Sequence, residues 1–146
     1  MSGGQTGVDR AALDVALERG LRCGGWCPRG RLAEDGPLPE RYPLQETPSA
    51  EYSQRTEWNV RDSDATLVLT WGPPSGGTSY TIDRARSLGR PHLVVDLGGA
   101  PRREAVLAWL RAEDVRVLNV AGPRESGRSG VYAKARRFLE AVFTSA

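Results

Sequence analysis

Histidine, lysine and cysteine are nearly missing from this sequence, and their scarcity excludes several kinds of site. The 146 residues include one histidine, His92, one lysine, Lys134, and two cysteines, Cys23 and Cys27. His92 opens an apolar run typical of a buried strand, so the sequence offers neither a Ser–His–Asp arrangement nor a His-based metal site. The cysteines stand four residues apart in CGGWC, which is neither the redox C-x-x-C spacing nor part of a zinc set. We therefore predict reduced thiols, no metal and no recognisable catalytic set.

Long apolar runs and a strong charge of one sign are missing too. No run is long enough to cross a bilayer and no secretory signal is present, so we expect a cytoplasmic protein with no membrane partner. The net charge is only +2, whereas nucleic-acid binding would need a dense basic stripe. Nearly all the positive charge is arginine, which fits compact anions, although GC-rich coding explains the enrichment equally well. With 39% hydrophobic and 26% charged residues, we expect one globular domain, 1–146.

Apolar periodicity predicts an alternation of strands and helices from residue 65 to the end of the chain. We expect helices at 8–19, 51–62, 78–88, 101–112 and 131–143, strands at 65–71, 92–97 and 115–120, and a short strand at 21–25. Short connections between strand and helix imply right-handed crossovers, and so a mostly parallel sheet with helices on both faces. This is an α/β fold of Rossmann-like type, in which ligands bind beyond the carboxyl ends of the strands.

One long segment, 26–48, interrupts the pattern with five prolines and two glycines. Proline removes a backbone donor and disfavours helix, so we expect a loop, and long loops in small domains are usually functional. Its Arg29 and Arg31 are candidates for binding phosphate, and Glu34 and Asp35 are candidates for binding a ribose or a metal. A solvated loop is the alternative. On the polar helix that follows, Arg55 and Asn59 share a face.

Glycine-rich turns at three helix starts carry the strongest signal. Glycine lets a backbone approach a ligand closely, and a helix start offers free N–H groups with a positive dipole end. The first turn, SGGQTGVDR, leads into a helix without a full strand before it, and helix capping is its plain alternative. The other turns, GPPSGGTS and AGPRESGRSG, follow predicted strands. An ordinary βα loop is the alternative for the second turn, and a mobile surface loop is an equal alternative for the third. Candidate ligand contacts in these turns are Gly3, Gly4, Gln5, Thr6, Gly7, Asp9, Arg10, Gly76, Gly77, Thr78 and Arg124.

These motifs resemble the family of putative molybdenum carriers, a circularly permuted branch of the nucleotide-binding superfamily of the lonely-guy enzymes and DprA. The matching stretches are SGGQTGVDRAALDVAL, GWCPRGRLAEDGPLPERYPL, RTEWNVRDSDATLVL, GGTSYT and NVAGPRES. The resemblance implies a Rossmann-like fold, usually oligomeric, with a ligand site at SGGQTG and GGT. It favours as site residues Gly3, Gly4, Thr6, Gly7, Arg29, Arg55, Asn59, Gly76, Gly77 and Thr78.

Two departures from the family are visible. The family's leading strand is absent before SGGQTG, and the glutamate of the P-G-G-x-G-T-x-x-E element of the enzymatic relatives has no counterpart here. We therefore expect a binding or carrier protein for a phosphorylated or oxyanionic small molecule: molybdenum cofactor, molybdate or a nucleotide. A nucleosidase or phosphoribohydrolase, with Glu34 or Asp35 as acid or base, is the first alternative. A nucleotide-sensing regulator is the second, and a homo-oligomer, dimer or tetramer, is expected throughout.

Overall fold

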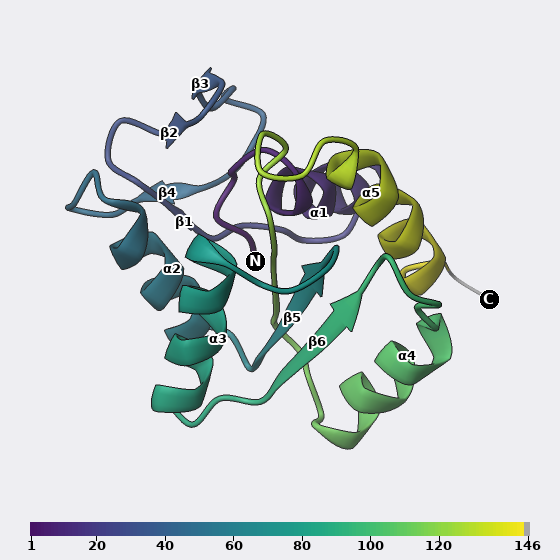
Figure 1. Cartoon of the computed structure of the whole chain (residues 1–146). Helices are drawn as coiled ribbons and strands as arrows, with labels where there is room; N and C mark the ends of the chain where they lie inside the picture. The colour runs from purple at the N-terminus through teal and green to yellow at the C-terminus, as the bar shows by residue number, and fades with distance from the viewer. Residues whose placement is uncertain (145–146) are drawn as a thin grey trace.

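The structure is a computed structural model that describes residues 1–144. Its helices are α1 (Val8–Glu18), α2 (Tyr52–Arg61), α3 (Gly76–Ser87), α4 (Arg103–Ala112) and α5 (Val131–Val142). Its strands are β1 (Trp26–Cys27), β2 (Leu32–Ala33), β3 (Gly36–Pro37), β4 (Gln45–Glu46), β5 (Ala65–Thr70), β6 (His92–Asp96) and β7 (Leu118–Ala121). Figure 1 shows their arrangement. Among residues 1–144, no helix is both long and apolar enough to cross a membrane.

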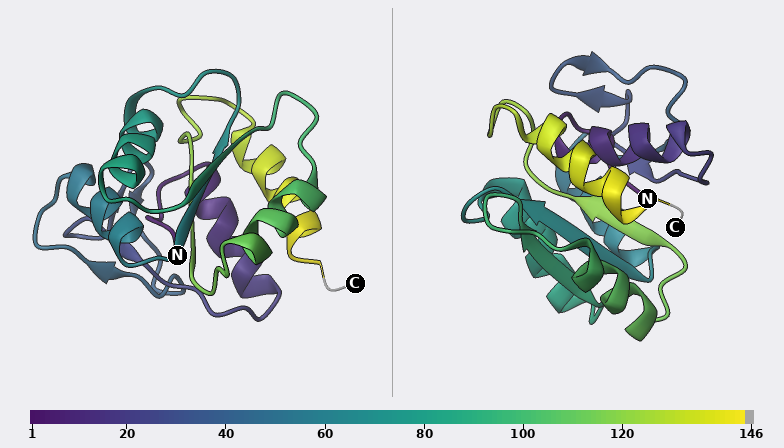
Figure 2. Two further views of the ribbon diagram at one scale, coloured as in Figure 1. Left: turned by 90° about the horizontal axis from the view of Figure 1, so that it is seen from below. Right: turned by 90° about the vertical axis from the view of Figure 1, so that its right-hand side faces the viewer.

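The main sheet has three parallel strands in the order β6-β5-β7. All of β5 is buried, as its nearly continuous apolar sequence requires of a central strand. Helices lie on both sides of this sheet (Figure 2, left). Buried side chains of α1, α4 and α5 form one core with Leu67, Leu69 and Val120 of the sheet, while α2 packs beside α3 on the opposite face. The predicted Rossmann-like α/β fold with a mostly parallel sheet is confirmed.

The first glycine turn is anchored to the sheet through Met1 and Ser2. The Val120 amide donates to the Met1 carbonyl at 2.9 Å, and the Ser2 amide donates to the Gly24 carbonyl at 3.1 Å. Two residues of backbone thus connect β7 to the segment that leads into β1, which itself pairs in parallel with β4. The turn that we expected to lack a strand therefore follows a short extended segment with sheet-type hydrogen bonds.

Several predicted boundaries were wrong for reasons that the contacts explain. Residues 21–25 form no strand in the described chain; pairing begins only at Trp26, after Gly25 turns the backbone at φ 139°. Helix α3 begins at Gly76, so both glycines of its turn lie inside the helix. Strand β7 begins later than expected because the Asp64 carboxylate accepts the amides of residues 116 and 117. Strand β6, predicted to be buried, lies at the sheet edge and is partly exposed.

The segment 26–48 is an ordered structure that contains β1 to β4. Arg31 organises it, because its guanidinium donates to the backbone carbonyls of residues 38, 39, 42 and 44. Tyr42 is 1% exposed, and its hydroxyl donates to Asp14 of α1 at 2.6 Å. Backbone-directed hydrogen bonds of this kind hold together a segment whose strands are only two residues long. Arg31 therefore has a structural role in the segment.

Candidate functional site

A cavity of about 520 Å³ lies at the carboxyl ends of β5 and β7. Its walls come from the first glycine turn, from α2, from the turn that begins α3, and from the loop between β7 and α5. These segments are distant in sequence, but the parallel strands bring their following turns to one edge of the sheet. The cavity falls within the range of volumes typical of sites for organic ligands.

The start of α3 presents free backbone N–H groups to this cavity. Gly76 and Gly77 are exposed cavity-lining residues, and a Cβ built on either would meet no atom of residues 1–144 within 4 Å. Gly76 adopts φ 52°, a backbone conformation that favours glycine. Ser75 precedes the helix without making a side-chain capping bond to the described residues. The amides of Gly76 and Gly77, which begin this 12-residue helix, make no hydrogen bond to residues 1–144, whereas those of Thr78 and Ser79 donate to the Ser75 carbonyl at 3.1 and 3.4 Å. The two glycine amides are therefore available to an anion, with the positive end of the helix dipole behind them.

The first glycine turn differs, because several of its amides already donate hydrogen bonds within the chain. The Gly4 amide donates to Ser2 Oγ at 3.4 Å, the Thr6 amide to Gln5 Oε1 at 3.1 Å, and the Val8 amide to the Pro123 carbonyl at 3.2 Å. Gly7 has φ 79°, and its added Cβ would lie 2.3 Å from the Pro123 oxygen. Close packing against the β7–α5 loop thus explains this glycine without a ligand.

Asp9 and Arg55 form a buried pair in the cavity wall. Arg55 Nη1 lies 3.4 Å from Asp9 Oδ2 and donates to the Gly3 carbonyl at 2.9 Å. Both side chains are about nine-tenths buried, with relative exposures of 10% and 9%. Burial raises the pKa of Asp9 to about 6, although the charge of Arg55 and the Gln5 amide act in the opposite direction. A carboxyl group with such a pKa in a cavity is a candidate functional group.

Gln5 contributes one unused hydrogen-bond donor to the same wall. Its side-chain oxygen accepts the backbone amides of Thr6 and Glu34, at 3.1 and 2.8 Å. The residue is 4% exposed and lines the cavity, yet its Nε2 has no hydrogen-bond partner among the described residues. Leaving a buried donor unpaired costs about 1–3 kcal/mol, so such an atom calls for an explanation.

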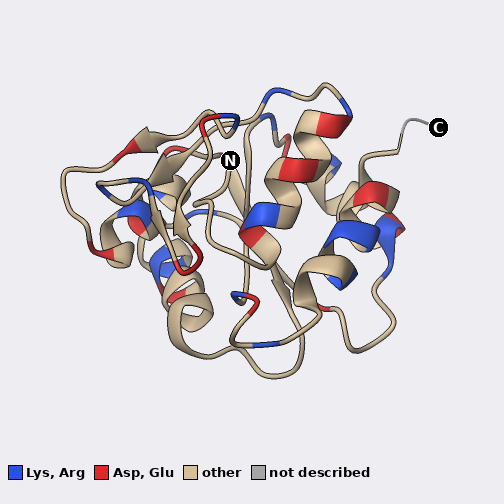
Figure 3. Ribbon diagram, turned by 90° about the horizontal axis from the view of Figure 1, so that it is seen from above, with Lys and Arg blue, Asp and Glu red and all other residues tan. Residues whose placement is uncertain are grey.

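Arginine and aromatic side chains complete the lining. Arg55 and Arg124 both lie over the ring of Tyr52, with their Cζ atoms 5.1 and 5.5 Å from its centroid. Arg128 lies over Trp71, with its Cζ atom 4.1 Å from the ring centroid. Stacking on aromatic rings orients guanidinium groups while leaving their edges free for anions. Over the molecule as a whole, basic and acidic residues are interspersed (Figure 3).

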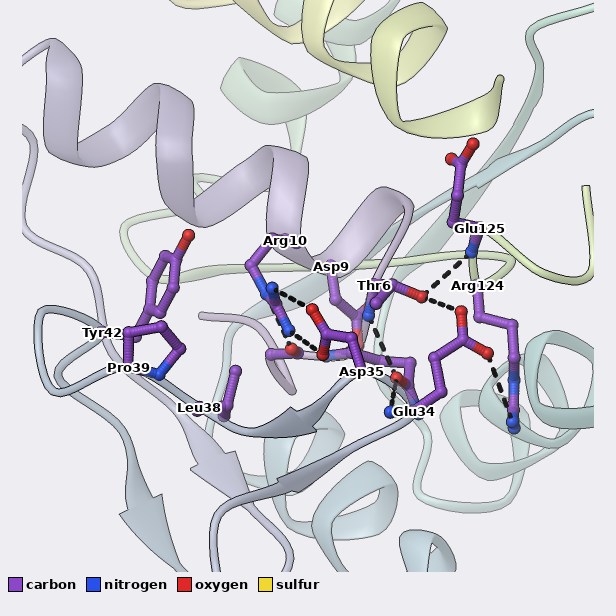
Figure 4. A network of polar contacts seen from close by, with 12 residues as sticks. Thr6, Asp9, Arg10, Glu34, Asp35, Leu38, Pro39, Tyr42, Arg124 and Glu125 are labelled. Carbon is purple, nitrogen blue, oxygen red and sulfur yellow. Dashed lines mark hydrogen bonds and ion pairs between the residues drawn. The ribbon is translucent and has the colours of Figure 1, made fainter. Parts of the chain in front are cut away.

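Glu34 and Asp35 lie beside the first turn but do not line the cavity (Figure 4). Thr6 Oγ1 and the Ser126 amide donate to Glu34, and Arg10 forms two hydrogen bonds to Asp35, at 3.0 and 3.1 Å. The pKa of Glu34 is lowered because hydrogen bonds from Ser126 and Thr6 outweigh the effect of burial. The hydrogen bond from Arg10 is the main cause of the lowered pKa of Asp35. Asp35 ties the 26–48 segment to α1, and Glu34 ties it to the first turn and to the β7–α5 loop. Neither carboxylate lines the cavity, so both are poorly placed as acid or base for a ligand there.

The structure brings together part of the predicted site. The cavity lining includes Gly3, Gln5, Asp9, Arg55, Asn59, Gly76, Gly77, Thr78 and Arg124, but not Gly4, Thr6, Gly7, Arg10, Arg29, Glu34 or Asp35. Arg29 is exposed, and its backbone amide bonds to the Ser49 carbonyl at 3.0 Å. Asn59 holds the backbone of Trp26 through two hydrogen bonds. Its Oδ1 accepts one from the Trp26 amide at 2.8 Å, and its Nδ2 donates one to the Trp26 carbonyl at 3.0 Å.

Among the lining residues that sequence reasoning missed are Tyr52, Trp71 and Asn119. Asn119 is a polar residue within a buried apolar run, and this pattern was a usable signal. Trp71 directly follows a buried strand, where site residues gather in such folds. Tyr52 carried no signal of its own. Within residues 1–144, no group of three or more His, Cys, Asp and Glu residues is arranged to hold a metal ion.

Comparisons with known proteins agree on one family. The circularly permutated YpsA SLOG family matches residues 1–143 of the chain. A crystal structure named as a putative molybdenum carrier protein, from Syntrophus aciditrophicus SB, superimposes with a TM-score of 0.94. The two chains are 43% identical, and the match covers 98% of this chain and 92% of the other. No curated protein matches the sequence significantly.

Proposed function

Because the chain belongs to the circularly permutated YpsA SLOG family, we propose that it is a binding or carrier protein for a phosphorylated or oxyanionic small molecule. One observation carries the proposal: the uncapped start of α3 opens into a cavity that is also lined by Arg124 and Arg128. Helix-start amides and guanidinium groups together are the usual protein ligands of phosphate.

The cargo class follows from this chemistry and from the similar protein. Amide N–H groups and arginines bind phosphate and molybdate in the same way, because both are tetrahedral oxyanions. The similar structure from Syntrophus aciditrophicus is named for molybdenum, which supports molybdenum cofactor or molybdate as the cargo, with nucleotides as the next candidates. The proposal includes homo-oligomeric assembly and action in the cytoplasm, to be tested by light scattering and by cell fractionation.

The variant Gly77→Asp tests the proposed anion site at α3. A carboxylate in the first turn favours the helix dipole, so the melting temperature should stay equal or rise slightly. The same charge should repel an anion from the free amides and weaken binding of AMP, inorganic phosphate and molybdate at least tenfold. Isothermal titration calorimetry measures the binding, and circular dichroism measures the melting temperature.

Ala105→Asp is the matched control for this variant. Ala105 is exposed in the first turn of α4 and does not line the cavity, so the same charge change should leave every affinity at the wild-type value. Equal affinities for Gly77→Asp and the wild type would contradict the site. A wild-type protein that binds none of the phosphate compounds, molybdate or molybdenum cofactor would contradict the function itself.

A nucleotide-hydrolysing enzyme is the second candidate function, favoured by the placement of Asp9. This carboxyl group lines the cavity and has its pKa raised to about 6 by burial, a range suited to proton transfer near neutral pH. The candidate predicts release of adenine and ribose 5-phosphate from AMP, measured by chromatography and lost in Asp9→Asn. A wild-type protein that leaves AMP intact excludes it.

A further inference from the structure

We propose that Asp9 is a specificity-determining residue that selects phosphate esters with a hydroxyl- or amino-bearing body over free tetrahedral oxyanions. The inference rests on the proposed function, because it assumes that the phosphate binds at the start of α3. It concerns the opposite wall of the same cavity, formed by the first glycine turn and α2.

The unused polar atoms of that wall single out Asp9. Its Oδ2 accepts two long hydrogen bonds, from the Gln5 amide and from Arg55 Nη1, each 3.4 Å. Its Oδ1 makes no hydrogen bond to any residue from 1 to 144. A carboxylate can accept about four hydrogen bonds, so this group retains most of its capacity for a donor supplied from the cavity.

Neighbouring polar side chains do not compete for this role. The side-chain amide of Asn59 is hydrogen-bonded to the Trp26 backbone, and Asn119 Nδ2 lies 3.3 Å from Thr66 Oγ1. Gln5 Nε2, by contrast, is a buried donor without a partner in the described chain. A free acceptor on Asp9 and a free donor on Gln5 therefore share one wall, and together they match a group that both donates and accepts, such as a hydroxyl.

The charge distribution gives the cavity two different ends. Arg55 is 3.4 Å from Asp9, so its positive charge is largely offset within the wall. The start of α3 and Arg128 retain the positive character of the remaining lining, whereas Arg124 Nη1 lies 3.9 Å from Glu34 Oε2 and its charge is partly offset. A free phosphate or molybdate would gain little from the carboxylate, because an oxyanion offers few or no hydrogen-bond donors to Asp9. An ester that places its phosphate at α3 and its hydroxyl groups near Asp9 satisfies both ends.

The size of the cavity agrees with an ester cargo. About 520 Å³ exceeds the space that one tetrahedral oxyanion fills and matches sites that enclose organic molecules. Tyr52 and Trp71 add aromatic surface to the lining. The ligand class that fits the whole cavity is a phosphate ester with a polar organic body.

Calorimetry with four probes tests the inference: ribose 5-phosphate, n-pentyl phosphate, inorganic phosphate and molybdate. The wild type should bind ribose 5-phosphate at least tenfold more tightly than each of the other three. Asp9→Asn should weaken the binding of ribose 5-phosphate at least tenfold. The same variant should bind inorganic phosphate and molybdate as tightly as the wild type or more tightly. Asp83→Asn, an exposed carboxylate of α3 outside the cavity, is the matched control and should behave as the wild type.

The outcomes separate this inference from the proposed function. Equal wild-type affinities for all four probes would leave the anion site standing and overturn the role of Asp9. If Asp9→Asn weakened the binding of all four probes equally, the role of Asp9 would also be overturned, because the residue would then not distinguish esters from free oxyanions. If Asp9→Asn fails to fold, the wild-type affinities for ribose 5-phosphate and n-pentyl phosphate test the inference instead. The two esters differ in their hydroxyl groups, so equal affinities would overturn it.

Discussion

At the scale of single residues, Asp9 shows how burial changes the chemistry of a side chain. The carboxyl group lies in the first turn of α1, where a negative charge is normally favourable. Its burial outweighs this benefit and also the charge of Arg55, and raises its pKa to about 6. The native protein therefore holds the Asp9 proton more tightly than the unfolded chain does.

This shift predicts a pH dependence of stability. Below pH 4 Asp9 is protonated in both states, so it costs nothing. As the pH rises from about 4 to about 6, the unfolded chain loses the proton first and the native state becomes relatively less stable. At about 1.4 kcal/mol per pKa unit, the full penalty above pH 6 is about 3 kcal/mol.

Urea unfolding of the wild type and Asp9→Asn at pH 4 and pH 7 measures this penalty. The free energy of unfolding of the wild type, relative to that of the variant, should fall by up to about 3 kcal/mol between the two pH values. All other ionising groups are shared by the two proteins and cancel in the difference. A difference that does not change with pH would contradict the assignment.

At the scale of elements, the two glycines that flank α1 have different reasons to be glycine. Gly7 before the helix and Gly20 after it both have positive φ angles, 79° and 68°. A Cβ on Gly7 would lie 2.3 Å from the Pro123 oxygen, whereas a Cβ on Gly20 meets nothing within 4 Å in the described part of the chain. Only Gly7 is required by contact with another element, the β7–α5 loop.

The pair Gly7→Ala and Gly20→Ala separates backbone strain from steric contact. Gly20→Ala should lower the free energy of unfolding by about 1–2 kcal/mol, because it adds only the cost of a positive φ. Gly7→Ala should lower the free energy of unfolding clearly more than Gly20→Ala does, because the loop after β7 must also move. Overpacking alone costs about 1–3 kcal/mol. Urea unfolding measures both values. Equal losses would show that the contact with Pro123 is unimportant.

At the scale of the whole molecule, Asp14 joins three parts of the chain. From α1 it accepts hydrogen bonds from the hydroxyls of Tyr42, in the 26–48 segment, and Tyr132, at the start of α5. Tyr42 is 1% exposed, so its hydroxyl has little access to water. Asp14 thus helps to hold the irregular segment and the last helix against the first helix.

Asp14→Ala should lower the free energy of unfolding by about 1–3 kcal/mol, because it leaves the two hydroxyls without their acceptor. Asp14→Asn retains one side-chain oxygen, so its free energy of unfolding should fall distinctly less. Guanidinium unfolding followed by tryptophan fluorescence measures both variants. Equal losses for Ala and Asn would indicate that the charge of Asp14, and not its acceptor capacity, is what matters.

From residue 65 onward the sequence by itself determined the alternation of strands and helices and the parallel sheet. It also indicated the family, which the comparisons confirm. Those features depend on apolar periodicity and on glycine turns, which are local information. It also predicted that Gly3 and Gly76 lie in one cavity, since parallel strands align their carboxyl ends.

Only the tertiary structure decided which polar groups remain free within these turns. The Val8 amide donates to the distant Pro123 carbonyl, and Glu34 is held by Thr6 and Ser126. The Glu125 amide reaches Thr6 Oγ1 across 119 residues of sequence. Whether an amide or a carboxylate is available to a ligand depends on partners at such separations, which packing sets and local pattern does not encode.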